Sequence, residues 1–320
     1  MKMAQNAAHV GIDVSQAELV VYIDLDKEYL KLPNTPAGWA DLLARLEKLD
    51  LAFVALEATG GYERGVTDYL RATMVKVWVV DPRRVRQFAR AGGRRAKTDT
   101  IDARMIALFG ATYADECPEV PQVSADREKL REHVSYRRQL IDERTMTSNQ
   151  QRMIANQELQ NMNNDRIALL DKQIKAVDNA IDEIIADNAV LARLAAIISS
   201  VKGVGPVMVA TLLAMLAELG TLDRRRLAAL VGVAPYANDS GKRSGTRAIA
   251  GGRADVRNVL YMAALSVRKY CPPLREFYER LIAKGKKPKV ALVALMRRLL
   301  GILNALVRDD VLWDTKHATP

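Results

Sequence analysis

Short apolar runs alternate with more polar segments over residues 8–110. The runs are rich in Val and Ile, which is typical of half-buried or buried strands. Thr35 followed by Pro36 predicts the start of a helix, because threonine is a good N-cap and proline suits the first turn. Hairpin strands followed by strands that alternate with helices indicate a mixed sheet flanked by helices. The predicted strands are Val10–Val14, Leu19–Leu25, Leu51–Leu56 and Val75–Val80, with Glu28–Leu32 as a further hairpin strand.

Neither Gly nor Pro occurs from Ser124 to Ser200, and apolar residues there recur every three or four positions. This stripe predicts a coiled coil, with the polar Asn188 fixing its register. The alternative is one helix packed on its own domain. The more polar run Asp126–Asn163 predicts a second helix. The stripe consists of Ile167, Leu170, Ile174, Val177, Ile181, Ile184, Asn188, Leu191, Ala195 and Ile198.

From Val201 onward the pattern predicts helices with two irregular inserts. The first, VKGVGP, resembles the turn of a helix-hairpin-helix, whose glycines let backbone N–H groups approach a DNA phosphate. A Gly-Pro turn between two buried helices would have the same signature. The second is a polar loop from Tyr236 to Arg247, followed by Gly251, Gly252 and a predicted helix over Val256–Val267. Such a loop between apolar helices more often carries function than packing.

Length, charge and cysteine usage narrow the class of protein. We expect an α/β domain over 1–123, a helical coiled-coil arm over 124–200 and an all-α domain over 201–320. The formal net charge of +10 favours a polyanionic partner. The two cysteines, Cys117 and Cys271, lack metal-ligand spacing, and so small a number fits a reducing cytoplasm. The N-terminus lacks an apolar signal core, and the most apolar stretch, Gly203–Leu216, is too short to span a bilayer. A soluble cytoplasmic protein is expected.

Four carboxylates occupy positions where a metal site is expected. Asp13 and Glu57 end short β-type runs, while Asp99 and Asp102 share one face at the start of a predicted helix. Inward-facing carboxylates need neutralisation, for which a hard divalent cation is the usual means. If the two strands are adjacent, the four can hold one or two Mg²⁺ ions, and two ions about 3.5–4 Å apart would serve a phosphoryl transfer. Taken singly, each acid could instead end a strand, cap a turn or begin a helix.

A basic strip lies between Glu57 and the aspartate pair, where no acid occurs from Pro82 through Thr98. Seven cations without a compensating acid repel one another unless a polyanion is near. Contact with nucleic-acid phosphates is therefore favoured over a solvated helix face, and it predicts steep salt dependence. The strip consists of Arg83, Arg84, Arg86, Arg90, Arg94, Arg95 and Lys97.

Ser240 is a candidate nucleophile in the second irregular insert. Attack of a serine on phosphorus requires help with deprotonation and with the charge on the phosphorane, and clustered Arg and Lys supply the second. A serine in a turn is more often only a turn residue, and Ser244 is a rival for the role. The surrounding cations are Lys242, Arg243, Arg247, Arg253 and Arg257.

Six segments together resemble the DEDD transposases of the one-ten family of bacterial insertion sequences, which includes bridge-RNA-guided recombinases. They are GIDVS, LEATGGYE, KTDTIDARMIA, VKGVGP, LVGVAPYANDSGKRSG and GGRADVRNVLYMAAL, in the family's order and over nearly the whole chain. The resemblance implies a ribonuclease-H-like, resolvase-type first domain whose metal-binding tetrad is Asp13, Glu57, Asp99 and Asp102. It also implies that Ser240 forms a transient phosphoserine link to DNA. Asp239 precedes this serine where relatives can carry Glu.

The resemblance further implies a composite site and several partners. Family members form dimers and tetramers through the coiled coil, and the carboxylates of one protomer serve the serine of another. A structured noncoding RNA pairs with donor and target DNA, so base pairing selects the sequence. The basic strip and the polar helices would then contact RNA by shape and charge.

Two other functions are compatible with parts of this pattern. A hydrolytic junction resolvase would use only the four carboxylates and water, but would need neither the long heptad arm nor the serine loop. A nucleic-acid-binding scaffold would keep the carboxylates as structural residues.

Overall fold

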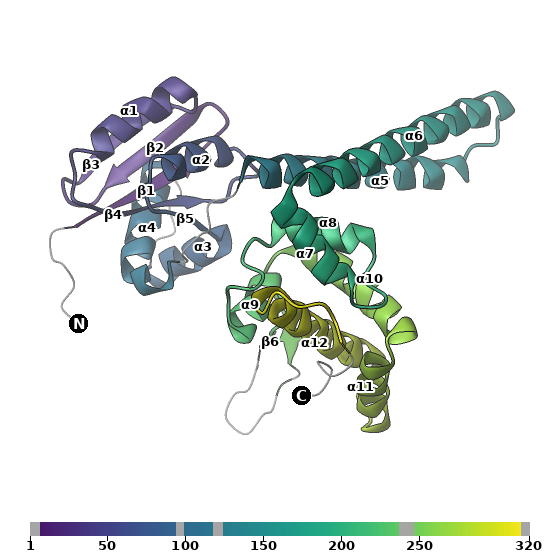
Figure 1. Ribbon diagram of the computed structural model, residues 1–320. Coiled ribbons are helices and arrows are strands. Elements are labelled where there is room, and N and C mark those ends of the chain that lie inside the picture. The colour runs from purple at the N-terminus through teal and green to yellow at the C-terminus, as the bar shows by residue number, and fades with distance from the viewer. Residues whose placement is uncertain (1–6, 94–98, 118–123, 237–244, 246, 315–320) are drawn as a thin grey trace. The chain divides into compact units, whose positions relative to one another are not determined.

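The computed structural model describes residues 7–93, 99–117, 124–236, 245 and 247–314. The chain divides into two compact units, Met1–Gln122 and Val123–Pro320, referred to below as unit 1 and unit 2 (Figure 1). Unit 1 is mixed α/β and unit 2 is almost entirely helical. The predicted mixed sheet followed by a helical remainder is confirmed at this level.

Unit 1 contains a five-stranded sheet with the order β3-β2-β1-β4-β5. β1, β2 and β3 are antiparallel neighbours, whereas β4 runs parallel to both β1 and β5. The five predicted strands are all present, and none of their ends differs from the prediction by more than two residues. Their bounds are β1 Ala8–Val14, β2 Glu18–Ile23, β3 Glu28–Pro33, β4 Leu51–Glu57 and β5 Val77–Val80.

Helices cover both faces of this sheet. On one face, α1 (Pro36–Leu46) and α2 (Arg64–Ala72) bury the even-numbered residues of β1. On the other face, α3 (Pro82–Ala91) and α4 (Asp99–Thr112) pack against Phe53, Ala55 and Trp78, and a short 3₁₀ turn follows at Ala114–Glu116. The side chain of Thr35 accepts a hydrogen bond from the Gly38 N–H, as expected for the N-cap of α1.

Gly11 in β1 determines how closely α4 approaches the sheet. A Cβ atom at this position would lie 2.2 Å from the Ala103 carbonyl oxygen and 2.4 Å from the Ala107 nitrogen. Only a residue without a side chain permits this contact between the strand and the helix backbone. The helix therefore lies directly on β1.

Unit 2 consists of eight described helices and a two-stranded ribbon. Its main core includes buried residues of α8, α10 and α12. The bounds are α5 Ala125–Gln151, α6 Gln157–Asp187, α7 Ala189–Ser199, α8 Pro206–Met215, α9 Arg224–Val231, β6 Pro235–Tyr236, β7 Ala248–Ile249, α10 Ala254–Tyr270, α11 Pro272–Ala283 and α12 Pro288–Arg308.

The predicted apolar stripe becomes one side of an antiparallel hairpin formed by α5 and α6 (Figure 1). Leu170 and Ile174 of α6 pack on Leu140 of α5, and Arg166 pairs with Glu143 at 2.5 Å. The prediction that Asn188 fixes the register of a coiled coil running through it is wrong. The helix breaks at this residue, whose side chain accepts from the N–H groups of Val190 and Leu191 and so caps α7.

The turn between α7 and α8 contains the two glycines of VKGVGP. Gly203 has φ +95°, and a Cβ there would lie 2.9 Å from the backbone of Val267 in α10. Close packing against α10 thus explains Gly203 without a phosphate. Gly205 has open space where a Cβ would be and is the N-cap of α8.

One described helix, α12, is long and apolar enough to cross a membrane. Half of the most apolar stretch of this helix is buried inside unit 2, where the side chains of Leu295, Leu299 and Leu303 are fully buried. Core helices of soluble proteins can be equally long and apolar. We therefore treat α12 as a core helix.

Candidate active site

The sheet register brings Asp13 and Glu57 to adjacent positions. In the parallel pair β1 and β4, Ile12 lies opposite Leu56, so Asp13 and Glu57 are the next residue on each strand. Side chains alternate along a strand, so these two acids share the face of Gly11 and Ala55. α4 covers that face, because Gly11 contacts Ala103 and a Cβ at Gly110 would lie 3.1 Å from Ala55. Both acids are half-buried.

The direction of α4 brings the aspartate pair toward the same edge. Near its C-terminus, Gly110 contacts Phe53, which lies early in β4. One or two turns earlier, Ala103 packs with Val20, the cross-strand partner of Asp13. The N-terminal end of α4 therefore lies toward the carboxyl ends of β1 and β4. Its first turn carries Asp99 and Asp102 there.

The chemistry of these four residues fits a hard divalent cation, which prefers carboxylate oxygen ligands. Three of the four, Asp13, Glu57 and Asp102, lie within the described part of the chain. For Asp99 the backbone is described but the side chain is not. Among the side chains that the structure does describe, no three of His, Cys, Asp and Glu are grouped closely enough to hold a metal ion.

Two polar residues organise the loops that follow Asp13 and Glu57. The Asn34 amide donates to the carbonyls of Ser15 at 2.9 Å and Tyr62 at 3.1 Å, which joins the two loops. Its oxygen accepts from Trp39 Nε1 at 2.8 Å. In the second loop, Glu63 accepts from the N–H groups of Thr59 and Gly61. The carboxyl end of the sheet is thus cross-braced by side chains.

The predicted basic strip is partly described. Arg83, Arg86 and Arg90 are exposed on α3. Arg84 is also exposed, and its guanidinium carbon lies 5.0 Å from the ring centre of Phe109 in α4 and 5.7 Å from that of Tyr113, which follows α4. The other three predicted members, Arg94, Arg95 and Lys97, lie outside the described residues.

The candidate nucleophile Ser240, its rival Ser244, and the nearby Lys242 and Arg243 also lie outside the described residues. The structure does describe the base of their loop, where β6 pairs with β7. Below this ribbon the two chain segments touch backbone to backbone. A Cβ at Gly232 would lie 2.2 Å from the Gly251 oxygen, and one at Gly252 would lie 2.3 Å from the Gly232 nitrogen.

Two arginines at this base bind the protein itself, although the sequence suggested nucleic-acid contacts for them. Arg253 donates to both oxygens of Glu218 at 2.6 Å and to the Met215 carbonyl at 2.8 Å. Arg257 donates to the carbonyls of Val231 and Gly251. The third described cation of the loop, Arg247, is exposed.

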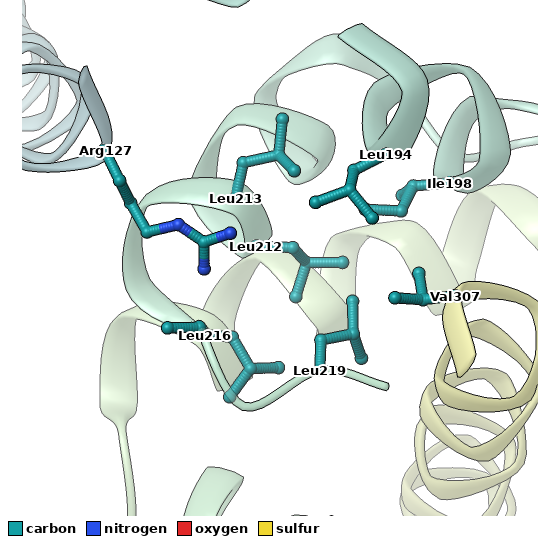
Figure 2. Close-up of a pocket in the computed structure, with 9 residues that line it drawn as sticks. Arg127, Leu194, Ile198, Leu212, Leu213, Leu216, Leu219 and Val307 are labelled. Carbon is teal, nitrogen blue, oxygen red and sulfur yellow. The ribbon is translucent and has the colours of Figure 1, made fainter. Parts of the chain in front are cut away.

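Arg127 of α5 extends the charged cluster into an apolar pocket. Its guanidinium points among leucines that include Leu212, Leu213 and Leu216 (Figure 2). Burial lowers the pKa of Arg127, and the charge of Glu218 acts in the opposite direction. For Glu218, burial alone would raise the pKa, but the hydrogen bonds and charge of Arg253, together with a backbone hydrogen bond and the charge of Arg127, lower the pKa overall. Glu218 is therefore ionised at neutral pH and locks Arg253.

Three residues that organise these sites were not predicted from the sequence, namely Asn34, Glu63 and Glu218. The sequence does contain a signal for Glu218, because an acid within the apolar run from Met215 to Leu219 needs a cationic partner. It contains no such signal for Asn34 or Glu63, since polar residues in turns are common.

Two protein-family models and several known proteins match this chain. A family model described as a transposase of the DEDD type of IS110 matches residues 10–159, and one for the transposase IS116/IS110/IS902 family matches residues 195–279. The pilin gene-inverting proteins of Moraxella lacunata and Moraxella bovis are each 30% identical over 275 residues, which is 82% of this chain and 81% of each relative. An uncharacterized 42 kDa protein of insertion element IS900 from Mycobacterium paratuberculosis is 34% identical over 163 residues, 48% of this chain and 40% of that protein.

Proposed function

Because the chain belongs to the IS110-type family of DNA transposases and recombinases, we propose that it cuts and rejoins DNA with four carboxylates and a serine. The observation that carries this proposal is the adjacency of Asp13 and Glu57 on the sheet face covered by α4, whose first turn contains Asp99 and Asp102. A five-stranded mixed sheet with helices on both faces is compatible with a ribonuclease-H-like fold.

Asp13, Glu57, Asp99 and Asp102 would hold one or two Mg²⁺ ions. The bound metal would stabilise negative charge on phosphate oxygens during phosphoryl transfer. The loops braced by Asn34 and Glu63 would keep the first two carboxylates at the strand ends. The exposed arginines of α3 would neutralise nearby DNA or RNA phosphates.

Ser240 would supply the nucleophile. Its oxygen would bond to phosphorus as the bond to the leaving deoxyribose oxygen breaks, and its proton would pass to a nearby base. Attack by a strand hydroxyl on the phosphoserine would then rejoin DNA and return the serine. The locked base of the loop supports this role, since a nucleophile must be held within a few tenths of an ångström of its productive position.

The test of the serine is a denaturing gel that separates free protein from a covalent protein–DNA adduct. With donor and target DNA and Mg²⁺, we expect an adduct from the natural chain and none from Ser240→Ala. Ser244→Ala is the matched control and should keep the adduct. An adduct that persists in the first variant and disappears in the second would assign the nucleophile to Ser244.

The test of the metal site is Mn²⁺ binding followed by electron paramagnetic resonance. Asp13→Asn should weaken binding and abolish DNA cleavage, whereas Asp41→Asn, which removes an exposed acid of α1, should change neither. Intact metal binding and cleavage in Asp13→Asn would favour a scaffold with structural carboxylates.

A hydrolytic junction resolvase is the second candidate function. It is favoured by the fact that all four carboxylates belong to unit 1, whereas Ser240 belongs to unit 2. This function predicts cleavage with no adduct and full activity in Ser240→Ala.

The proposed partners are donor and target DNA, a guide RNA and further copies of the chain in the cytoplasm. The α5–α6 hairpin would join two protomers, and dimers would assemble into tetramers. Its exposed apolar residues Met146, Met153, Leu159, Met162 and Leu169 support such an interface. Light scattering would give the assembly size, and sequencing of co-purified RNA would reveal a guide. Random cellular RNA in that fraction would contradict RNA guidance.

A further inference from the structure

A second basic surface lies on unit 2, at the meeting point of α9, α11 and α12. We call it the α9–α12 patch. From Arg280 to Arg308 the chain contains no acid. The patch consists of Arg224, Arg280, Lys284, Lys286, Lys289 and Arg298, of which all but Arg298 are exposed.

Three of these guanidinium groups converge from three helices. Arg280 and Arg298 both lie over the ring of Phe277, with their guanidinium carbons 5.7 Å and 4.8 Å from its centre. Arg224 reaches α12 as well, because a Cβ at Gly301 would lie 3.2 Å from its Nε. Gly301 is one turn from Arg298 on the same side of α12. The aromatic ring and the glycine thus hold three positive charges at one place.

This arrangement is electrostatically unfavourable for the protein alone. Burial lowers the pKa of Arg298, and the charges of Arg224 and Arg280 lower it further. Within the described residues, neither Arg224 nor Arg280 forms an ion pair with an acid, although Glu276 and Glu279 are exposed on α11. Arg224 also stands at the N-terminus of α9, where a cation opposes the helix dipole. A polyanionic partner at the patch would relieve the repulsion among these three guanidinium groups.

We propose that the α9–α12 patch binds the phosphodiester backbone of a nucleic acid. The proposal rests on the proposed function, which supplies DNA and a guide RNA as candidate polyanions. The three arginines around Phe277 and Gly301 can contact phosphates of one strand, which follow one another about every 3.4 Å along a duplex. Guanidinium forks on a rigid ring suit phosphate oxygens, and the flexible lysines of the α11–α12 turn add charge at the rim.

The test compares two variants of the full chain that each lose three positive charges. The patch variant carries Arg224→Gln, Arg280→Gln and Lys284→Gln. The matched control carries Lys27→Gln, Lys48→Gln and Lys76→Gln, which are exposed on unit 1. Fluorescence anisotropy measures affinity for a random-sequence DNA duplex and for an RNA hairpin, in EDTA and over a range of NaCl concentrations.

In the patch variant we expect the slope of log K against log salt to become less steep by about 2–3, since each lost phosphate contact removes about 0.9. Affinity at 150 mM salt should fall by about tenfold or more, and the control should change much less. Because the patch charges repel one another, the melting temperature should not fall. A loss for DNA alone or RNA alone identifies which nucleic acid is bound, and either supports the proposal.

Equal slopes in the patch and control variants would overturn the proposal. So would patch-dependent binding to phosphatidylserine vesicles with unchanged binding to DNA and RNA. If the patch variant is unstable, Lys284→Gln with Lys286→Gln and Lys289→Gln tests the exposed turn alone. Binding is measured without metal or strand cleavage, so its failure is distinct from failure of the carboxylate and serine proposals.

Discussion

Units 1 and 2 both bring distant segments together at a candidate catalytic element, but by different means. In unit 1, backbone pairing of β1 with β4 aligns Asp13 and Glu57, and Gly11 lets α4 lie on them. In unit 2, Gly232 and Gly252 let two chain segments touch, while Arg253 binds Glu218 and Arg257 of α10 binds the Gly251 carbonyl. A sheet positions residues by repeating hydrogen bonds, whereas a loop base needs individual side-chain bonds.

The largest effect is expected from Gly252→Ala at the loop base. Gly252 has φ +71°, and a Cβ would lie 2.3 Å from the Gly232 nitrogen. The left-handed backbone and the overlap together should lower the free energy of unfolding of unit 2 by about 3 kcal/mol. Gly285→Ala is the control, because it has φ +76° and open space around a Cβ. If denaturant unfolding shows the same loss of unfolding free energy in both variants, the backbone contact at Gly252 contributes nothing to stability.

Gly11→Ala makes the corresponding change in unit 1 and should cost about 2 kcal/mol, since overlap with the Ala103 carbonyl forces α4 outward. Hydrogen exchange should increase in α4, and Mn²⁺ affinity should fall because Asp99 and Asp102 move with the helix. Gly92→Ala, with a negative φ and ordinary contacts, should leave both unchanged. Unchanged exchange in Gly11→Ala would contradict the close contact.

Glu218→Gln tests the ionic lock of the loop base. Removing the charge should destabilise unit 2 by about 2 kcal/mol at pH 7, allowing for the partial exposure of Arg253. The lowered pKa of Glu218 means that its contribution is present above its ordinary pKa of 4.5 and is lost as pH falls through the folded value. The stability difference between the natural chain and the variant should therefore shrink from pH 6 to pH 3.

Glu279→Gln, which removes an exposed acid of α11, should show no such pH dependence. Glu218→Gln should also slow adduct formation if Ser240 is the nucleophile, because the loop base loosens. A constant stability difference from pH 6 to pH 3 would contradict the assigned role of the Glu218 charge.

The smallest effect is expected from Asn34→Ala, which should cost about 1 kcal/mol through three lost hydrogen bonds. Asn34→Asp keeps an acceptor for Trp39 but loses the donors to Ser15 and Tyr62. If the brace between the loops matters for the carboxylates, both variants should weaken Mn²⁺ binding measured by calorimetry. If Asn34→Ala weakens Mn²⁺ binding and Asn34→Asp does not, the hydrogen bond to Trp39 is the one that matters.

Local pattern was sufficient to predict most elements of this protein. The strands of unit 1, the N-cap of α1 and the helical character of unit 2 follow from periodicity and capping, which involve residues a few positions apart. The placement of acids at strand ends followed in the same way. That these two acids lie next to each other depends on the order of the strands in the sheet, which the local sequence pattern does not determine.

By itself, the sequence determined the elements and the residue types available for chemistry, because those depend on neighbours along the chain. Tertiary structure decided which residues meet: that Asn188 caps a new helix, that Gly203 packs on α10, that Arg253 binds Glu218, and that arginines of three helices converge around Phe277 and Gly301. These outcomes depend on contacts between segments far apart in sequence, and the same local pattern is compatible with many such contacts.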